Sequence, residues 1–170
     1  PADVYVGLRS AQRFVAETAP IRIQVISTGV DGAVRRGQPV VVRALERRSR
    51  FVVERRGDDW DSHWQTDDRE VGRCSVTTGP QPADCRIGPQ RPGYYVIEAT
   101  TTHASHRVAK PTLDLWVTGG GWVPTEQETL ELVPEKSAVA PGERARILVR
   151  APFAHGRGLM HRHVKPSRII

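Results

Sequence analysis

The two cysteines are the residues of this chain best placed for covalent chemistry, because Cys74 and Cys85 lie close together on either side of a turn-rich segment. Residues 78–82 contain one glycine and two prolines. Proline presets φ and glycine permits positive φ, so we expect a hairpin-like reversal here. Cysteines that flank a short reversal can reach disulfide distance, and we expect this pairing rather than two free thiols.

Histidine pairs and an acidic cluster are the candidates for metal binding. His161 and His163 would share one face of a strand and could bind one zinc ion, but a third ligand at matched spacing is missing. We interpret this pair and the pair His103 and His106 as exposed loop residues. Clustered carboxylates suit calcium, and five aspartates lie near each other: Asp58, Asp59, Asp61, Asp67 and Asp68. They lack a ligand loop of the usual spacing, so we expect a solvated loop, no metal and no cofactor.

The sequence lacks the common catalytic motifs. Serine and histidine occur, but the Gly-x-Ser-x-Gly elbow of hydrolases does not, and neither does a P-loop or a GxGxxG motif. We therefore expect that this protein is not an enzyme. Trp60 and Trp64 suit either an exposed binding platform or packing over a sheet edge, and we expect the second.

Composition and charge narrow the class further. The chain has 170 residues, which is enough to bury one core and leave a partial second unit. A net charge of +6 fits either an anionic partner or an arginine-rich proteome, and the scattered arginines favour the proteome. No apolar run is long enough to span a membrane, so we expect no membrane insertion. The chain begins at Pro1 without a signal peptide, which suggests an excised or processed piece. A disulfide would imply the periplasm, the cell surface or the extracellular space.

Short segments of β-branched, aromatic and alternating apolar residues predict the elements that position these groups. The expected strands are 4–8, 21–25, 40–45, 51–56, 71–77, 94–102 and 113–117, with a short bridge at 14–16. Asp31-Gly32, Arg36-Gly37 and Gly57-Asp58 are expected turns, and we interpret 60–68 as a loop or a ragged strand. No capped helical period occurs. The pattern predicts an all-β, antiparallel β-sandwich of the immunoglobulin or fibronectin III type.

An internal repeat predicts the domain boundary. Residues 4–16 align without gaps on 128–140, and 21–25 align on 145–149, at a constant offset of 124 residues. We infer a tandem array, with one domain at 1–124 and the start of a second at 125–170. A few strands cannot bury their own apolar residues, which are Leu130, Leu132, Ile147 and Val149. We therefore expect this second segment to be poorly ordered, to dock on the first domain, or to pair with another molecule, and its basic tail to be flexible.

Several motifs, in order, resemble a macroglobulin domain of the bacterial α2-macroglobulins. They begin with Tyr5-Val-Gly-Leu-Arg-Ser and Asp31-Gly-Ala-Val, and continue with Cys74-x-Val-Thr-x-Gly and Pro92-Gly-Tyr-Tyr-Val-Ile-Glu-Ala. The stretch from Leu130-Glu-Leu-Val-Pro-Glu-Lys to Ala151-Pro-Phe is similar to the opening of the next module of that family, which leads into the bait-region domain. The resemblance extends to about Met160.

The resemblance implies a structural module of a periplasmic or surface-anchored protein that traps endopeptidases when they cut a bait. Its partners would be neighbouring macroglobulin domains and, indirectly, endopeptidases, with no nucleic acid. The sequence departs from the family after Met160, where it looks truncated or frame-shifted. A bait loop and the Cys-x-Glu-Gln thioester are also missing. The alternative is a basic immunoglobulin-like binding module that contacts anionic glycan, lipid head groups or nucleic acid.

Overall fold

The computed structural model describes residues 4–101, 110–120 and 129–159, and all its regular elements are strands. The strands that follow one another along the chain are β1 (Tyr5–Arg9), β2 (Phe14–Ala16), β3 (Ile21–Thr28), β4 (Pro39–Arg56), β5 (Asp59–Thr77), β6 (Ala83–Ile87), β7 (Gly93–Thr101), β8 (Thr112–Thr118), β9 (Glu131–Pro134) and β10 (Ile147–Arg150). The expected all-β class is confirmed.

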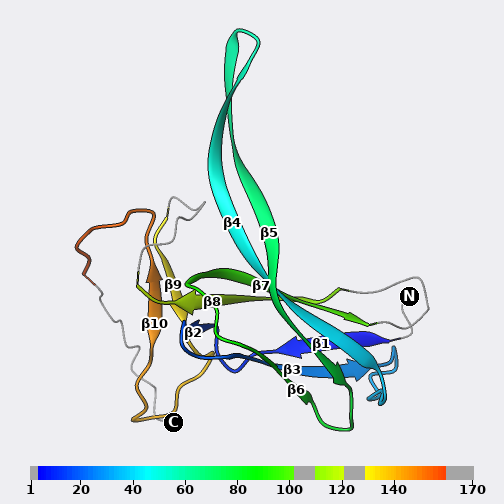
Figure 1. Cartoon of the computed structure of the whole chain (residues 1–170). Coiled ribbons are helices and arrows are strands. Elements are labelled where there is room, and N and C mark those ends of the chain that lie inside the picture. Colours follow the sequence, from blue (N-terminus) through cyan, green and yellow to red (C-terminus); the bar gives the residue numbers. More distant parts are fainter. Residues whose placement is uncertain (1–3, 102–109, 121–128, 160–170) are drawn as a thin grey trace.

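Two sheets pack face to face to form the sandwich (Figure 1). One has the order β1-β3-β6, and the other has the order β2-β8-β7-β4-β5. All strand pairs of the described residues are antiparallel except β2 with β8, which is parallel. This exception arises because the chain crosses from one sheet to the other between Arg9 and Phe14, so β1 and β2 run in the same direction on opposite layers.

The core lies between the two inner faces and follows from period-two alternation. Ile21, Ile23 and Val25 of β3 point inward while the residues between them are exposed. Opposite them, β4 contributes Val40 and Val42, with Ala44, Tyr95, Ile97, Ala99, Leu115 and Val117 from the same sheet. Because Val41 faces outward, the contiguous valines of β4, whose inward face the sequence leaves ambiguous, resolve into an ordinary alternating strand.

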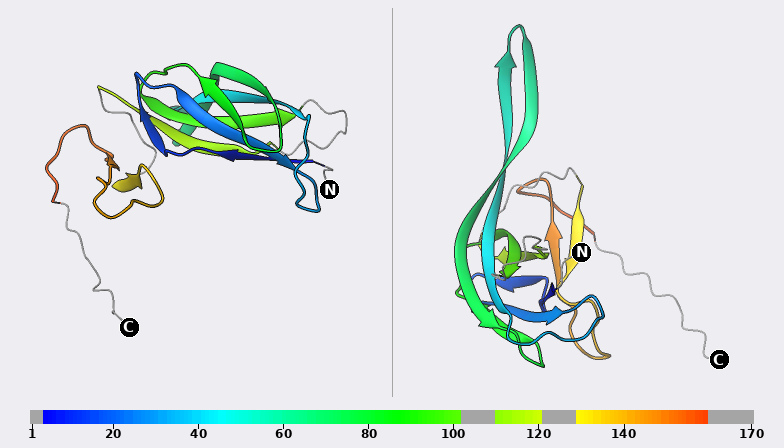
Figure 2. Two further views of the ribbon diagram at one scale, coloured as in Figure 1. Left: turned by 90° about the horizontal axis from the view of Figure 1, so that it is seen from below. Right: turned by 90° about the vertical axis from the view of Figure 1, so that its right-hand side faces the viewer.

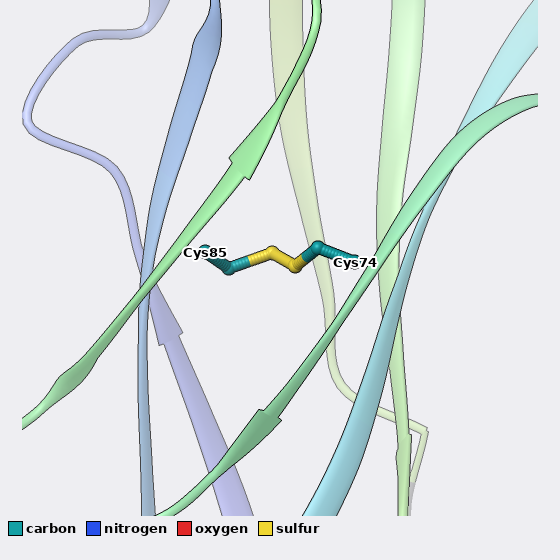
Figure 3. The surroundings of a disulfide bond; sticks show 2 residues. All are labelled: Cys74 and Cys85. Carbon is teal, nitrogen blue, oxygen red and sulfur yellow. A yellow bond between two sulfur atoms is a disulfide. The ribbon is translucent and has the colours of Figure 1, made fainter.

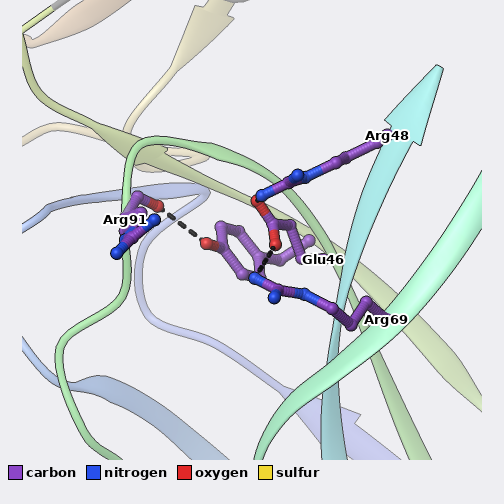
Figure 4. Close-up of polar contacts among 5 residues, drawn as sticks. Glu46, Arg48, Arg69 and Arg91 are labelled. Atoms are coloured by element: carbon purple, nitrogen blue, oxygen red, sulfur yellow. Dashed lines mark hydrogen bonds and ion pairs between the residues drawn. The ribbon is translucent and has the colours of Figure 1, made fainter. Parts of the chain in front are cut away.

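A buried carboxylate fixes the point at which β4 leaves the sandwich. Glu46 accepts hydrogen bonds from Arg48 Nη2 and Arg69 Nη2, each at 2.8 Å (Figure 4). Burial alone would raise the pKa of Glu46, but the hydrogen bonds and charges of the two guanidinium groups outweigh burial and hold this pKa below its ordinary value. Tyr95 closes the same corner by donating from its hydroxyl to the carbonyl of Arg91 at 2.7 Å.

Beyond this corner, β4 and β5 continue as a long two-stranded arm, which we define as residues 47–68 (Figure 2). Strand β7 pairs with β4 only as far as Arg47, opposite Tyr94. The sequence interpretation was wrong here, because it placed a break after residue 45 and a loop or ragged strand at 60–68. Both faces of a two-stranded ribbon are solvated, so the inward and outward alternation is lost while cross-strand pairing continues to the turn at Gly57, whose φ is 67°.

The segment between the cysteines is a crossing between sheets, not the expected hairpin. Strand β5 pairs with β4, whereas β6 pairs with β3 in the other sheet. After β5 the backbone of Thr78 exchanges hydrogen bonds with Gly37 and Gln38, and this contact turns the chain toward the second layer. Cys74 and Cys85 are joined by a disulfide whose Cα atoms are 6.0 Å apart, so the bond links the two sheets (Figure 3).

The strands β9 and β10 form a separate antiparallel pair beside one end of the sandwich (Figure 1). One face of this pair packs inward, where Val133 and Glu135 are buried. The other face leaves Leu132, Ile147 and Val149 exposed. Of the three expected outcomes for this segment, the structure has the docked one. The basic tail of residues 160–170 lies outside the described residues.

We predict that the inter-sheet disulfide stabilises the sandwich without being required for it. Reduction, or the double substitution Cys74→Ser and Cys85→Ser, should lower the free energy of unfolding by about 3 kcal/mol, because the unfolded chain gains the entropy of an opened loop. Cooperative unfolding should persist because the core residues are unchanged. Chemical denaturation with and without reductant measures this, with Ser75→Ala as the exposed control. An unchanged free energy after complete reduction would contradict a stabilising bond.

Candidate inter-domain interface

The interface between the sandwich and the β9–β10 pair is built on the outward face of β8. Trp116 lies between the buried residues Leu115 and Val117, so alternation turns its side chain away from the core. Its cross-strand partner on β7 is Tyr94, and the two rings stack with centroids 4.6 Å apart and planes inclined by 29°. The pair forms an aromatic platform on the outside of the five-stranded sheet.

Arg150 of β10 covers this platform. Its guanidinium carbon lies 3.8 Å from the centroid of the Trp116 ring, and only 16% of its side chain is exposed. The same guanidinium forms an ion pair with Glu131, which lies directly opposite on β9. A planar cation on an indole face is attracted by the ring electrons, and the contact strengthens as water is excluded. Arg150 therefore joins both strands of the pair to the sandwich.

Glu135 makes the second point of attachment. Its side chain is 9% exposed and accepts hydrogen bonds from Gln12 Nε2 at 2.7 Å and from Arg146 Nη1 at 3.1 Å. Its backbone carbonyl accepts a further hydrogen bond from the amide of Arg13 at 2.8 Å. Arg146 in turn lies over the ring of Phe14, 5.6 Å from its centroid. The segment between β1 and β2 is thereby tied to the segment that follows β9.

The aromatic platform also continues toward the arm. Asp68, Arg47, Tyr94 and Trp116 are cross-strand neighbours in one row over β5, β4, β7 and β8. Arg47 donates to Asp68 from Nε at 2.8 Å and from Nη2 at 2.7 Å. Burial, followed by a hydrogen bond to Asp114 and its charge, raises the pKa of Tyr94 to about 12. The row thus keeps a neutral, hydrogen-bonded phenol at its centre and links the base of the arm to β10.

The other candidate residues do not converge on a site. His103, His106, His161 and His163 lie outside the described residues. The five aspartates are spread along the arm, where Asp68 pairs with Arg47 and Asp58 lies 3.8 Å from Arg55. Over the ranges that the structure describes, no three His, Cys, Asp or Glu side chains are grouped to hold a metal ion. Trp60 and Trp64 are 70% and 40% exposed on the arm, so the expectation that they pack over a sheet edge was wrong.

Much of the positive charge is neutralised locally. Ion pairs with carboxylates involve Arg35, Arg43, Arg47, Arg48, Arg55, Arg69, Arg73, Arg146 and Arg150. These pairs are distributed over the outer face of the sheet, the arm and the docked pair. Their distribution does not create the single basic face that binding to a polyanion requires.

Sequence reasoning missed the interface residues Trp116, Arg150 and Glu135. A signal was present, because the repeat places Glu131 and Arg150 on Gly7 and Ile26, which pair in the first sheet. A prediction that β1 pairs with β3 would have placed Glu131 opposite Arg150. The stacking on Trp116 had no such signal, since it joins segments that the alignment treats as separate units.

This combination defines a β-sandwich module that is attached to a following pair of strands. The family model described as bacterial macroglobulin domain 6 matches residues 7–114, which all lie within the sandwich. The chain therefore belongs to the bacterial macroglobulin domain 6 family, and it is a macroglobulin domain of an alpha-2-macroglobulin-like protein.

Individual relatives agree with this assignment. An alpha-2-macroglobulin homolog of Nostoc sp. is 24% identical over 158 residues, which cover 91% of this chain and 8% of that protein. The structure of native E. coli alpha-2-macroglobulin covers 89% of this chain, at 16% identity and a TM-score of 0.56, and this chain spans 11% of it. Salmonella alpha-2-macroglobulin reacted with methylamine gives 16% identity, the same 89% coverage and a TM-score of 0.55, with 10% of its length matched. The chain thus spans about a tenth of the length of these relatives.

Helices are absent from the described ranges, so none there is long and apolar enough to cross a membrane.

We predict that Arg150→Ala detaches the β9–β10 pair without unfolding the sandwich. The loss of the contact with Trp116 and of the ion pair should weaken docking by about 1.4 kcal/mol and accelerate amide exchange in residues 147–150 about tenfold. Arg150→Lys should fall between the two, because an ammonium cannot stack as a plane. Exchange followed by mass spectrometry measures this, and the exposed Arg144→Ala serves as the control. Equal exchange in Arg150→Ala and the unaltered chain would exclude Arg150 as the attachment point.

Proposed function

We propose that this chain is a non-enzymatic structural module of a protease-trapping protein. In this proposal, residues 1–124 form one complete macroglobulin sandwich and residues 125–170 begin a second one. The module holds its neighbours in a fixed arrangement, so that cleavage of a bait elsewhere can move them together. Endopeptidases would be indirect partners, and a periplasmic or cell-surface location would keep the disulfide oxidised.

The observation that carries the proposal is a repeated strand register. In the first sandwich, Leu8 lies opposite Val25 in the β1–β3 pair. Displaced by 124 residues, Leu132 lies opposite Val149 in the β9–β10 pair. The same displacement relates every rung of β9–β10 to a rung of β1–β3. Because a slip of one residue would turn each side chain to the other face, an identical register supports a second copy of the same strand pair.

The exposed face of β9–β10 supports the same conclusion. In the first sandwich the core residues Ile23 and Val25 are 1% and 0% exposed. Their equivalents Ile147 and Val149 are 42% and 48% exposed, and Leu132 is exposed beside them. An apolar face of this kind requires a second layer. We infer that it is the inner face of a second sandwich and is available to the further strands that such a fold needs.

The interface gives this module its mechanical role. The contacts of Arg150 and Glu135 hold the first strands of the second unit against the outer face of the first. Both carboxylates of these contacts come from the segment after β9 or from β9 itself, and their partners lie on both units. A joint made of an arginine stack and a buried carboxylate restricts rotation more than an apolar contact, because hydrogen bonds are directional.

We predict that a chain ending at Pro124 folds cooperatively. It retains every buried residue of the two sheets except Val133 and Glu135, so its secondary structure by circular dichroism should match that of the full chain over the sandwich. A chain ending at Thr101 is the control and should not fold, since it loses β8 with Leu115 and Val117. Failure of the longer piece to fold would place the boundary elsewhere.

We predict that the chain alone neither captures nor cleaves peptidases. Incubation with a panel of endopeptidases should give no stoichiometric complex, because a bait loop is missing from the sequence. Binding to heparin should be weak and abolished by moderate salt, since the arginines are dispersed in ion pairs. Stoichiometric capture would overturn the structural role, and sub-micromolar heparin binding that persists at high salt would favour the basic binding module.

A further inference from the structure

The arm carries an apolar face that neither the sandwich nor the docked pair covers. Phe51 and Trp64 lie directly opposite each other, with ring centroids 5.5 Å apart in an edge-to-face arrangement. Phe51 and Val53 are each more than half exposed, and Trp60 on the same face is the most exposed of the arm aromatics. A two-stranded ribbon is marginally stable in water, and exposed aromatic clusters mark interaction surfaces.

The cross-strand pairs of this face form a ladder whose two sides are complementary. From the base to the tip, the rungs are Arg47 with Asp68, Ser49 with Thr66, Phe51 with Trp64, Val53 with Ser62, and Arg55 with Trp60. The β4 side of the arm carries arginines at 47, 48, 50, 55 and 56, whereas the β5 side carries aspartates at 59, 61, 67 and 68. One strand of the arm is therefore basic and the other is acidic.

We propose that this face binds the same face of a second copy of the chain, with the two arms side by side and their tips in the same direction. A twofold axis parallel to the arms then places the β4 side of one arm over the β5 side of the other. Each rung meets its complement: Arg47 lies over the copy's Asp68, Phe51 over its Trp64, and Arg55 over its Trp60. The contact combines four aromatic rings, two cation–π pairs and two ion pairs.

The opposite orientation is disfavoured by charge. A twofold axis perpendicular to the strands would stack β4 on β4 and β5 on β5, so that arginines face arginines and aspartates face aspartates. The acidic side also argues against a lipid surface as the occupant. Asp58, Asp59 and Asp61 cluster at the tip beside Trp60, where an anionic membrane would repel them. This proposal goes beyond the structural role above and does not depend on it.

Sedimentation of the 170-residue chain over a range of micromolar concentrations tests the proposal. The unaltered chain should form a reversible dimer. Phe51→Ser with Trp64→Ser should raise the dimer dissociation constant by roughly 30-fold or more, as expected for aromatic residues at the centre of an interface. The matched control is Val52→Ser with His63→Ser, on the opposite face of the adjacent rung, which should leave dimerisation unchanged.

A second measurement tests the orientation. A spin label on Asp58→Cys, introduced without reductant so that the native disulfide stays closed, should give a tip-to-tip distance of about 20 Å or less. Antiparallel arms would separate the labels by about 50 Å or more. The proposal is overturned by a monomer at every concentration, by a dimer that Phe51→Ser with Trp64→Ser leaves intact, by widely separated labels, or by a monomer that binds anionic vesicles through the arm.

Discussion

The stacking of Arg150 on Trp116 is the contact on which the arrangement of the two strand groups depends. Trp116 is available because alternation along β8 turns it outward, and Tyr94 supports it from the neighbouring strand. Arg150 is held over the ring by Glu131, so the cation is oriented before any contact with the sandwich is made. Without this contact, β9 and β10 would be a pair of four-residue strands with little apolar burial, which is too small to persist in water.

The two strand pairs illustrate how one sequence pattern serves two environments. In β1–β3 the inward residues are sealed by the second sheet, whereas in β9–β10 the equivalent residues face solvent. The polar face of β9–β10 is specialised instead: Glu131, Arg150 and Glu135 replace the small and apolar residues of the first copy and contact the sandwich. A repeated module can therefore retain its core face for its own layer and use its outer face to bind the preceding module.

Sequence reasoning succeeded where burial enforces alternation and failed where it does not. The residues of β3 alternate strictly because one face is sealed, and Gly32, Gly37 and Gly57 adopt positive φ at expected turns. The arm was missed because a ribbon with two wet faces shows no period, so polar residues resembled a loop. Trp60 and Trp64 were misplaced for the same reason. The crossing of β5 to β6 was mistaken for a hairpin because local turn residues do not reveal which strand each neighbour pairs with.

The interface lay beyond sequence reasoning for a different reason. Its contacts join residues more than a hundred positions apart, such as Gln12 with Glu135, and no local pattern encodes such a pair. The disulfide was within reach because its two residues are close in sequence and no other cysteine competes for them. Its role as a link between sheets required the topology.

The most direct test of a complete sandwich followed by the start of a second is native-state hydrogen exchange in increasing denaturant, resolved by residue. If the boundary is right, amides in residues 131–134 and 147–150 open together at a lower free energy and with a smaller denaturant dependence than those in 94–99 and 113–117. Opening of all four segments at the same free energy and with the same denaturant dependence would mean that the chain is one larger cooperative fold, and would contradict the account.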